Sequence, residues 1–222
     1  MVYYTFHIDD SGAIEDVNEE NINVENIPVC KMYDDEEFNK LNDIIHSLSN
    51  YILNEKALKI FKEFNTIPSE LRKAKVLRKE KVLGFFKKYK SYNYYELSFP
   101  DEKAMNCYEW IDFEKSEIFA IDSFQKQIKI TSHQQELDMI IENKSSCEIT
   151  YSFETKKVVF GKKFDSEIDL FKIPHYSWGT YISKRLKNKL EEAKITDIGF
   201  AESKEELGEM WKPHFPIIEF SK

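Results

Sequence analysis

Glycine, proline and arginine are scarce in this chain of 222 residues, and each shortage excludes a class of protein. With only 6 Gly and 6 Pro, the sequence is neither collagen-like nor of low complexity. The glycines also lie too far apart for a phosphate-binding loop, which needs closely spaced glycines so that backbone N–H groups reach the ligand. Arginines are few and the formal net charge is −8, which argues against a dedicated nucleic-acid-binding protein.

Cysteine and histidine form no local motif for a disulfide or a metal. Cys30, Cys107 and Cys147 include no C-x-x-C pair, so neither a disulfide framework nor a zinc knuckle is indicated. No two of the five histidines are three or four residues apart, which is the spacing of a helical zinc site. A G-x-S-x-G elbow for a serine nucleophile is also missing. We therefore expect no metal, no cofactor and no catalytic residues.

The N-terminus and the hydropathy of the chain indicate neither a signal peptide nor a membrane span. The N-terminus lacks the basic segment and the following apolar segment of a signal peptide. No window approaches 18 uninterrupted apolar residues, the length that a membrane-spanning helix requires. The expectation is a cytosolic protein with no membrane partner.

Charge is distributed unevenly along the chain. Residues 1–58 have a net charge of −10, residues 59–90 a net charge of +8, and residues 91–222 a net charge of −6. In the basic segment, the cations between Arg72 and Lys81 alternate with apolar residues, as in an amphipathic strand with a lysine-rich solvent face; a nucleic-acid surface is the alternative. Acidic groups such as Asp34-Asp35-Glu36-Glu37 could bind a hard cation, but they are more typical of a solvated face.

Apolar periodicity predicts an α+β fold, in which N-terminal helices pack on or beside a mostly antiparallel, sheet-rich C-terminal part. Two helices are expected, at 34–48 and 51–64, and one amphipathic helix, at 183–194, is expected to be capped by Ser183 and to bury Leu186, Leu190 and Ala193. A short helix is also expected at 138–143. Strands are expected in the β-forming parts of 75–99. The other expected strands are 2–8, 118–121, 128–131, 147–153, 158–160, 169–173, 180–182 and 195–200.

The expected organisation is an N-terminal strand and helical part, residues 1–70, followed by a sheet-rich part, residues 71–222; the alternative is one continuous domain. Residues 154–157 are interpreted as the loop of a hairpin between two of the strands. The 17 Phe and 12 Tyr indicate either a core of packed aromatic rings or a Tyr/Phe-lined pocket or stacking platform.

Two stretches resemble a known family. The first contains Tyr94-Tyr95-Glu96-Leu97 and continues after Pro100 to Asp112, Glu114 and Ser116. The second contains Asp169-Leu170-Phe171-Lys172-Ile173, followed by Ser183, Leu186, Leu190 and Phe200. Both are similar to patterns of the bacterial immunity proteins of polymorphic toxin systems, in particular a large immunity family first catalogued as a domain of unknown function. The resemblance covers roughly residues 75–202.

The resemblance implies a cytosolic protein that binds and neutralises a cognate toxin domain, without catalysis. Because many such toxins are basic, we expect Asp34, Asp35, Glu36 and Glu37 to form an acidic patch that faces the toxin. Two other classes of function stay open. One is a small-ligand-binding or regulatory module with a Tyr/Phe-lined pocket, and the other is an enzyme of unrecognised class.

Overall fold

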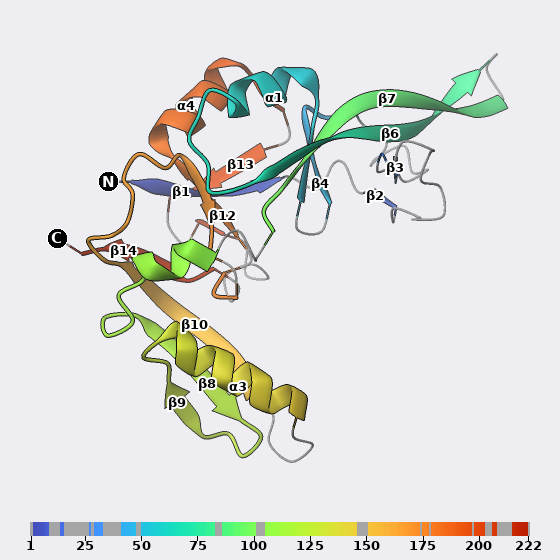
Figure 1. The fold of residues 1–222 in the computed structure, drawn as a ribbon. Helices are drawn as coiled ribbons and strands as arrows, with labels where there is room; N and C mark the ends of the chain where they lie inside the picture. Colours follow the sequence, from blue (N-terminus) through green and yellow to red (C-terminus); the bar gives the residue numbers. More distant parts are fainter. Residues whose placement is uncertain are drawn as a thin grey trace.

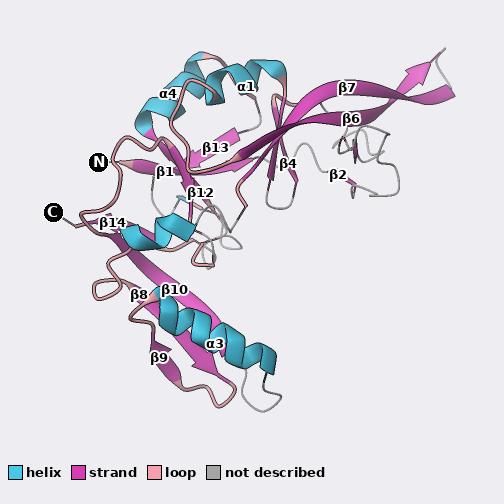
Figure 2. Cartoon of the chain, viewed as in Figure 1, coloured by secondary structure: helices cyan, strands magenta, loops and turns pink. Residues whose placement is uncertain are grey.

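The structure is a computed structural model of the chain, and it has the α+β class that the sequence predicts (Figure 1). Strands arranged in three sheets make up most of the regular structure, and helices are fewer (Figure 2). In the part of the chain that is described, no helix combines the length and apolarity needed to cross a membrane. The described residues are 2–8, 14–15, 27, 29–32, 41–47, 50–82, 86–100, 105–145, 151–173, 175–177, 179–196, 198–202, 206–207 and 215–221.

The first sheet joins the N-terminal strand to the C-terminal third of the chain. It is antiparallel, in the order β11-β12-β1-β13. Helix α4 packs against β12 and β1, and helix α1 packs against α4 (Figure 1). The bounds are β1 (Tyr3–Ile8), β11 (Leu170–Lys172), β12 (Thr180–Ser183), β13 (Ile198–Ala201), α1 (Glu55–Phe61) and α4 (Lys184–Glu192).

The second sheet contains the longest strands of the molecule. Its order is β2-β3-β6-β7-β5-β4, and all its pairs are antiparallel except β3 with β6. Strands β6 and β7 pair with each other from end to end and extend away from the body (Figure 1). The bounds are β2 (Ile14–Glu15), β3 (Val29–Met32), β4 (Ile44–Ser47), β5 (Asn50–Leu53), β6 (Glu70–Val82) and β7 (Phe86–Ser98).

The third sheet forms a separate arm of the molecule, with helix α3 packed against β10 (Figure 2). Its order is β14-β10-β8-β9, in which β10 and β14 are parallel. A short 3-10 helix, η2, precedes β8. The bounds are η2 (Met105–Trp110), β8 (Glu117–Asp122), β9 (Gln127–Lys129), α3 (His133–Ser145), β10 (Tyr151–Phe160) and β14 (Ile217–Phe220).

The two N-terminal helices predicted from periodicity are wrong over the described residues. Residues 44–47 and 50–53 form the antiparallel hairpin of β4 and β5, and only Glu55–Phe61 is helical. The sheet is covered on both faces here: Ile44 belongs to the main core, whereas Ile45 belongs to a smaller core on the other side. A strand buried on both faces has a continuous apolar run, and such a run is easily mistaken for one face of a helix.

The arm differs from the sequence-based expectation in two places. Residues 154–157 do not form a hairpin loop, because they lie inside the single strand β10. The run contains no glycine, proline or asparagine to make a turn, and a register shift against β8 between Thr155 and Lys157 accommodates it. Helix α3 also extends well beyond the predicted residues 138–143.

Candidate functional site

The second family-like stretch begins with a buried carboxylate. Asp169 is only 2% exposed, and its Oδ1 accepts hydrogen bonds from Ser183 Oγ at 2.6 Å and from Arg185 Nε at 3.1 Å. Its Oδ2 accepts from Arg185 Nη2 at 2.6 Å and from the Asn65 backbone N–H at 3.0 Å. Burial alone raises the pKa of Asp169, but these donors and the Arg185 charge outweigh it, so the pKa lies below its usual value.

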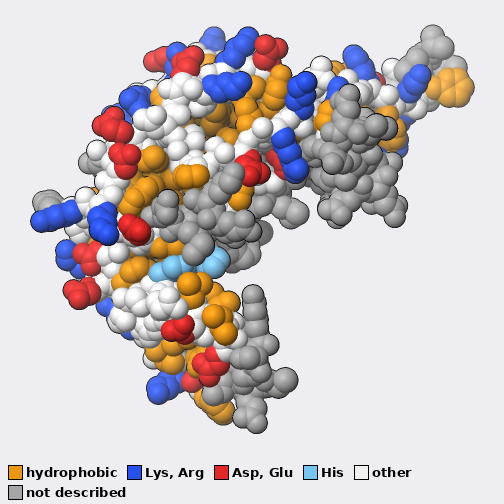
Figure 3. All heavy atoms as spheres, in the orientation of Figure 1, with side chains coloured by type: hydrophobic (Ala, Val, Ile, Leu, Met, Phe, Trp, Pro, Cys, Tyr) orange, Lys and Arg blue, Asp and Glu red, His pale blue; other side chains and the backbone are white. Residues whose placement is uncertain are grey.

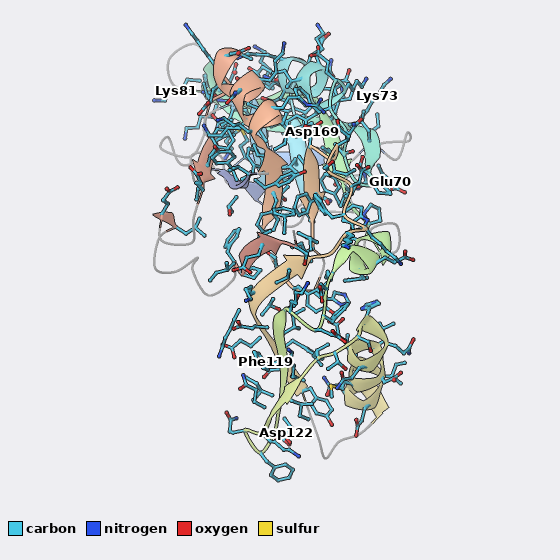
Figure 4. The ribbon with its side chains drawn as sticks, turned by 90° about the vertical axis from the view of Figure 1, so that its left-hand side faces the viewer. Glu70, Lys73, Lys81, Phe119, Asp122 and Asp169 are labelled. Carbon is cyan, nitrogen blue, oxygen red and sulfur yellow. The ribbon has the colours of Figure 1, made fainter. Side chains whose placement is uncertain are left out.

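Ser183 connects this carboxylate to helix α4. Its side chain caps the helix, because its Oγ accepts the Leu186 N–H at 3.1 Å while its O–H donates to Asp169. The predicted cap is therefore confirmed, as is the burial of Leu186 and Leu190. The aspartate, the cap and the helix form one unit with β11 and β12, and Asp169 lies in the upper part of the molecule (Figure 4).

The apolar residues of the second stretch all belong to the main core. Leu170 and Phe171 on β11 are fully buried, and the Phe171 ring stacks on Tyr181 with centroids 5.3 Å apart. Phe200 on β13 is partly buried, and its ring centroid lies 6.0 Å from that of Phe6. The pattern that resembles the family therefore describes how β1, β11, β13 and α4 pack.

The first stretch begins with two tyrosines that point to opposite faces of the second sheet, as neighbours in a strand must. Tyr94 is buried in the smaller core, and its O–H donates to the Asn42 carbonyl at 2.9 Å. Tyr95 packs against the main core. The adjacent pair thus marks a strand with both faces covered.

The end of the first stretch joins the segment before β8 to strand β10, within the third sheet. Ser116 is fully buried; its O–H donates to the Asp112 carbonyl at 2.7 Å and its Oγ accepts the Val159 N–H at 2.9 Å. The Asp112 carboxylate lies 3.0 Å from Lys115 Nζ. The hydrogen bond from Lys115 lowers the pKa of Asp112 and outweighs desolvation, which raises it. Glu114 is exposed and contributes its backbone carbonyl to Lys129.

Replacing Ser116 by alanine should reduce the free energy of unfolding by about 1–2 kcal/mol, because the Val159 N–H would stay buried without its acceptor. Chemical denaturation followed by circular dichroism measures the loss. The control is Ser152→Ala, at an exposed position of β10, the strand that contains Val159, and it should change stability by less than about 0.5 kcal/mol. Equal effects of the two substitutions would refute the role assigned to the Ser116 hydroxyl.

A cluster of titratable groups that sequence reasoning did not identify joins α3 to the turn at residues 175–177. Glu136 is fully buried, and its Oε2 accepts from the Tyr176 O–H and lies 2.9 Å from His133 Nδ1. Its Oε1 lies 3.5 Å from His175 Nδ1. The His133 ring stacks on Tyr108, with centroids 3.8 Å apart. Histidine side chains reach the surface where the arm meets the body (Figure 3).

The surroundings of Glu136 favour its ionised form. Burial by itself raises the pKa of this carboxyl, but His175, Tyr176 and His133 together hold it below its usual value. Burial and the Glu136 charge raise the pKa of Tyr176, which therefore stays a donor. His175 has a positive φ of 65°, a conformation that costs free energy in a non-glycine residue and that is retained only where the surroundings impose it. The one local sequence signal of this cluster is the spacing of His133 and Glu136, which lie three residues apart.

The described residues offer little to a metal or to thiol chemistry. Within them, no group of three or more His, Cys, Asp or Glu side chains could hold a metal ion. Cys30 and Cys107 are buried and free, and burial raises the pKa of Cys30 to about 11 and that of Cys107 to about 12. Both thiols are therefore protonated near neutral pH, whereas a nucleophilic cysteine must form the thiolate.

The basic segment forms a strand, as predicted, within the long hairpin of β6 and β7. Lys73 and Lys81 lie in the first and last parts of β6 (Figure 4). Near the body, Arg72 bonds the buried Glu96 of β7. Further out, Lys90 Nζ lies 3.6 Å from Glu80, and Tyr92 also donates to Glu80. Along β6 and β7, nine Lys and Arg residues outnumber three glutamates.

The predicted acidic patch, Asp34, Asp35, Glu36 and Glu37, lies outside the described residues. The structure brings the motif residues together in two places. Asp169 bonds Ser183 at the start of α4, and Ser116 bonds Val159 of β10. Tyr94 and Tyr95 lie in a third place, on β7. No protein-family model, curated protein or solved structure matches this chain.

Proposed function

We propose that this chain is a non-catalytic immunity protein, which binds and neutralises a cognate toxin domain. The observation that carries the proposal is the role of the residues that resemble the immunity family. Asp169, Ser183 and Leu186 fasten a helix to a sheet, and Ser116 joins the start of β8 to β10 within the arm. The resemblance therefore lies in the scaffold, and a protein that acts by binding needs a rigid scaffold more than a reactive constellation.

The shape of the molecule supports binding to a partner protein. A hairpin of two 13-residue strands extends from the body, and a separate arm carries the third sheet (Figure 1). Surfaces of this kind can engage a folded domain at more than one point, which adds affinity without any chemistry.

The aromatic side chains give little support to a ligand pocket. Tyr3, Phe160, Phe164, Phe171 and Phe220 pack on one another, with ring centroids 4.7–5.7 Å apart in every contacting pair. Such a mixture of edge-on, tilted and stacked contacts is typical of a filled aromatic core. The abundance of Phe and Tyr is thus used for packing in this part of the molecule.

Co-expression with a candidate toxin domain, taken from the C-terminal end of a large multidomain protein whose gene neighbours this one, tests the proposal. We expect the chain to restore growth of cells that produce the toxin domain, and the two proteins to elute together from a sizing column. A chain with Asp34, Asp35, Glu36 and Glu37 reversed to lysine should bind more slowly and with a weaker salt dependence. Growth inhibition that persists beside the intact chain, with no complex on the column, would eliminate the proposed function.

A further inference from the structure

The cluster around Glu136 connects two parts of the molecule that belong to different sheets. Glu136 lies in the first turn of α3, in the arm, whereas His175 and Tyr176 lie between β11 and β12 of the first sheet. Tyr108 of η2 stacks on His133, and its ring centroid lies 5.7 Å from that of Tyr176. The titratable groups that meet here, among the described residues, are therefore one carboxyl, two imidazoles and two phenols.

One oxygen of the buried carboxylate has no hydrogen-bond donor. Oε2 of Glu136 accepts from Tyr176 and faces Nδ1 of His133, but Oε1 has no hydrogen-bond partner among the described residues. Nδ1 of His175 lies 3.5 Å from Oε1. A buried carboxylate oxygen without a donor costs free energy, and hydrogen bonds to a charged donor are the strong ones. A proton on His175 would therefore supply both an opposite charge and a donor where Glu136 lacks one.

The two imidazoles differ in what an added proton would meet. Nε2 of His133 is buried and has no hydrogen-bond partner within the described residues, so an N–H at that atom would have no acceptor. His133 also begins α3, and the N-terminus of a helix disfavours a positive charge. The His175 side chain is 38% exposed, so water can reach it. His175 is therefore the histidine that can change its charge without creating a buried, unpaired donor.

The backbone fixes the position of His175 against α3. The N–H groups of Tyr176 and Ser177 both donate to the Ile173 carbonyl, at 3.1 and 3.0 Å, which closes the turn. His175 itself has a φ of 65°, which histidine adopts more readily than most residues other than glycine. The imidazole is thus presented to Glu136 by an ordered turn.

We propose that His175 and Glu136 form a pH-sensitive contact, which holds α3 to the first sheet more tightly when His175 is protonated. Desolvation raises the pKa of Glu136, but its interactions with His175 help to lower it. Coupling between two sites is reciprocal, so the ionised Glu136 increases the proton affinity of His175. The contact needs no toxin domain, and it therefore does not depend on the proposed function.

The direction of the pH dependence follows from this coupling. A histidine that binds its proton more tightly in the folded state stabilises the fold fully below its unfolded pKa of about 6.5. That contribution is lost as the pH rises through the folded pKa. At the acid end it is lost when Glu136 takes up a proton, below the unfolded value of about 4.3. The contact should therefore be strongest between about pH 4.3 and pH 6.5.

Other described attachments of α3 do not change charge in this range. Met139 packs against the main core, and the Asn143 side chain bonds the backbone of Tyr151. Neither side chain titrates. A pH-dependent change in the protection of α3 from hydrogen exchange would therefore report on the Glu136 cluster.

His175→Asn tests the contact, because asparagine also accepts a positive φ but does not titrate. The melting temperature of the intact chain should exceed that of the variant by about 2–4 °C at pH 5.5, and by less at pH 8. The comparison at each pH cancels the titration of the other four histidines. His133→Asn is the matched control, and should lower the melting temperature by the same amount at both pH values.

Two further measurements separate a proton-linked contact from a merely structural one. Titration of the intact chain by NMR should give His175 a pKa above about 6.5, and Glu136→Gln should lower that pKa. In the Glu136→Gln background, His175→Asn should no longer have a pH-dependent effect. A His175 pKa at or below 6.5, or an effect of His175→Asn that is equal at pH 5.5 and pH 8, would overturn the proposal.

Discussion

Replacing Asp169 by asparagine should lower the free energy of unfolding by about 2 kcal/mol, because the substitution removes the charge of a buried carboxylate that accepts charge-assisted hydrogen bonds from the largely exposed Arg185. The carboxylate accepts four hydrogen bonds, from Ser183, twice from Arg185, and from the Asn65 backbone. An amide has one oxygen to offer these donors, and its own N–H groups would face them. Urea denaturation at neutral pH measures the loss, which should come with weaker protection of the α4 amides from hydrogen exchange.

The effect should depend on pH in a defined direction. The folded pKa of Asp169 lies below the unfolded value of about 3.9, so its contribution is complete above that pH and is lost as the pH falls through the folded pKa. The stability difference between the protein and the variant should therefore shrink in acid. Glu167→Gln is the control, two residues away and exposed, and should be nearly neutral at every pH. A difference that stayed constant down to pH 2 would show that the charge of Asp169 is not what stabilises the fold.

Local signals in the sequence were sufficient where one short segment determines the structure. Ser183 followed by Leu186 and Leu190 predicts a capped helix, because the cap and the buried stripe lie within two turns. The β-forming run that contains Tyr94 and Tyr95 likewise becomes a strand. The class of the fold follows from such segments.

Contacts between distant segments could not be predicted in the same way. Ile44, Ile45, Tyr51 and Ile52 form strands because β5 pairs with β7 and because two separate cores cover the two faces of the sheet. None of these partners is visible in residues 41–53. The Asp169 carboxylate receives a backbone N–H from Asn65, which is 104 positions away. The burial of Glu136 depends on Tyr176, which is 40 positions away. Tertiary partners, which have no local periodicity, determine these features.

Glu136→Gln should lower the free energy of unfolding by about 3 kcal/mol, the second large effect that we expect. Among the α3 residues whose side chains are described, Glu136 is the only one that is fully buried. Ile141 on the same helix is 62% exposed. The Glu136 side chain is therefore one attachment of this helix to the rest of the molecule, beside the core packing of Met139 and the hydrogen bonds of Asn143 to the Tyr151 backbone. Losing the charge should loosen α3 and the turn at residues 175–177 together, which hydrogen exchange would detect.

A double-mutant cycle tests whether the cluster acts as a unit. Tyr176→Phe removes the O–H that donates to Glu136, and its effect should overlap with that of Glu136→Gln by at least about 1 kcal/mol. Asp138→Asn is the matched control, an equivalent change at an exposed position of α3, and should cost less than about 0.5 kcal/mol. The pKa of Glu136 is lowered in the folded protein, so its stabilisation is present above the unfolded value of about 4.3 and is lost as the pH falls through the folded pKa. Additive effects of the two cluster substitutions would mean that Tyr176 and Glu136 stabilise the fold independently, and that α3 is held by its other contacts.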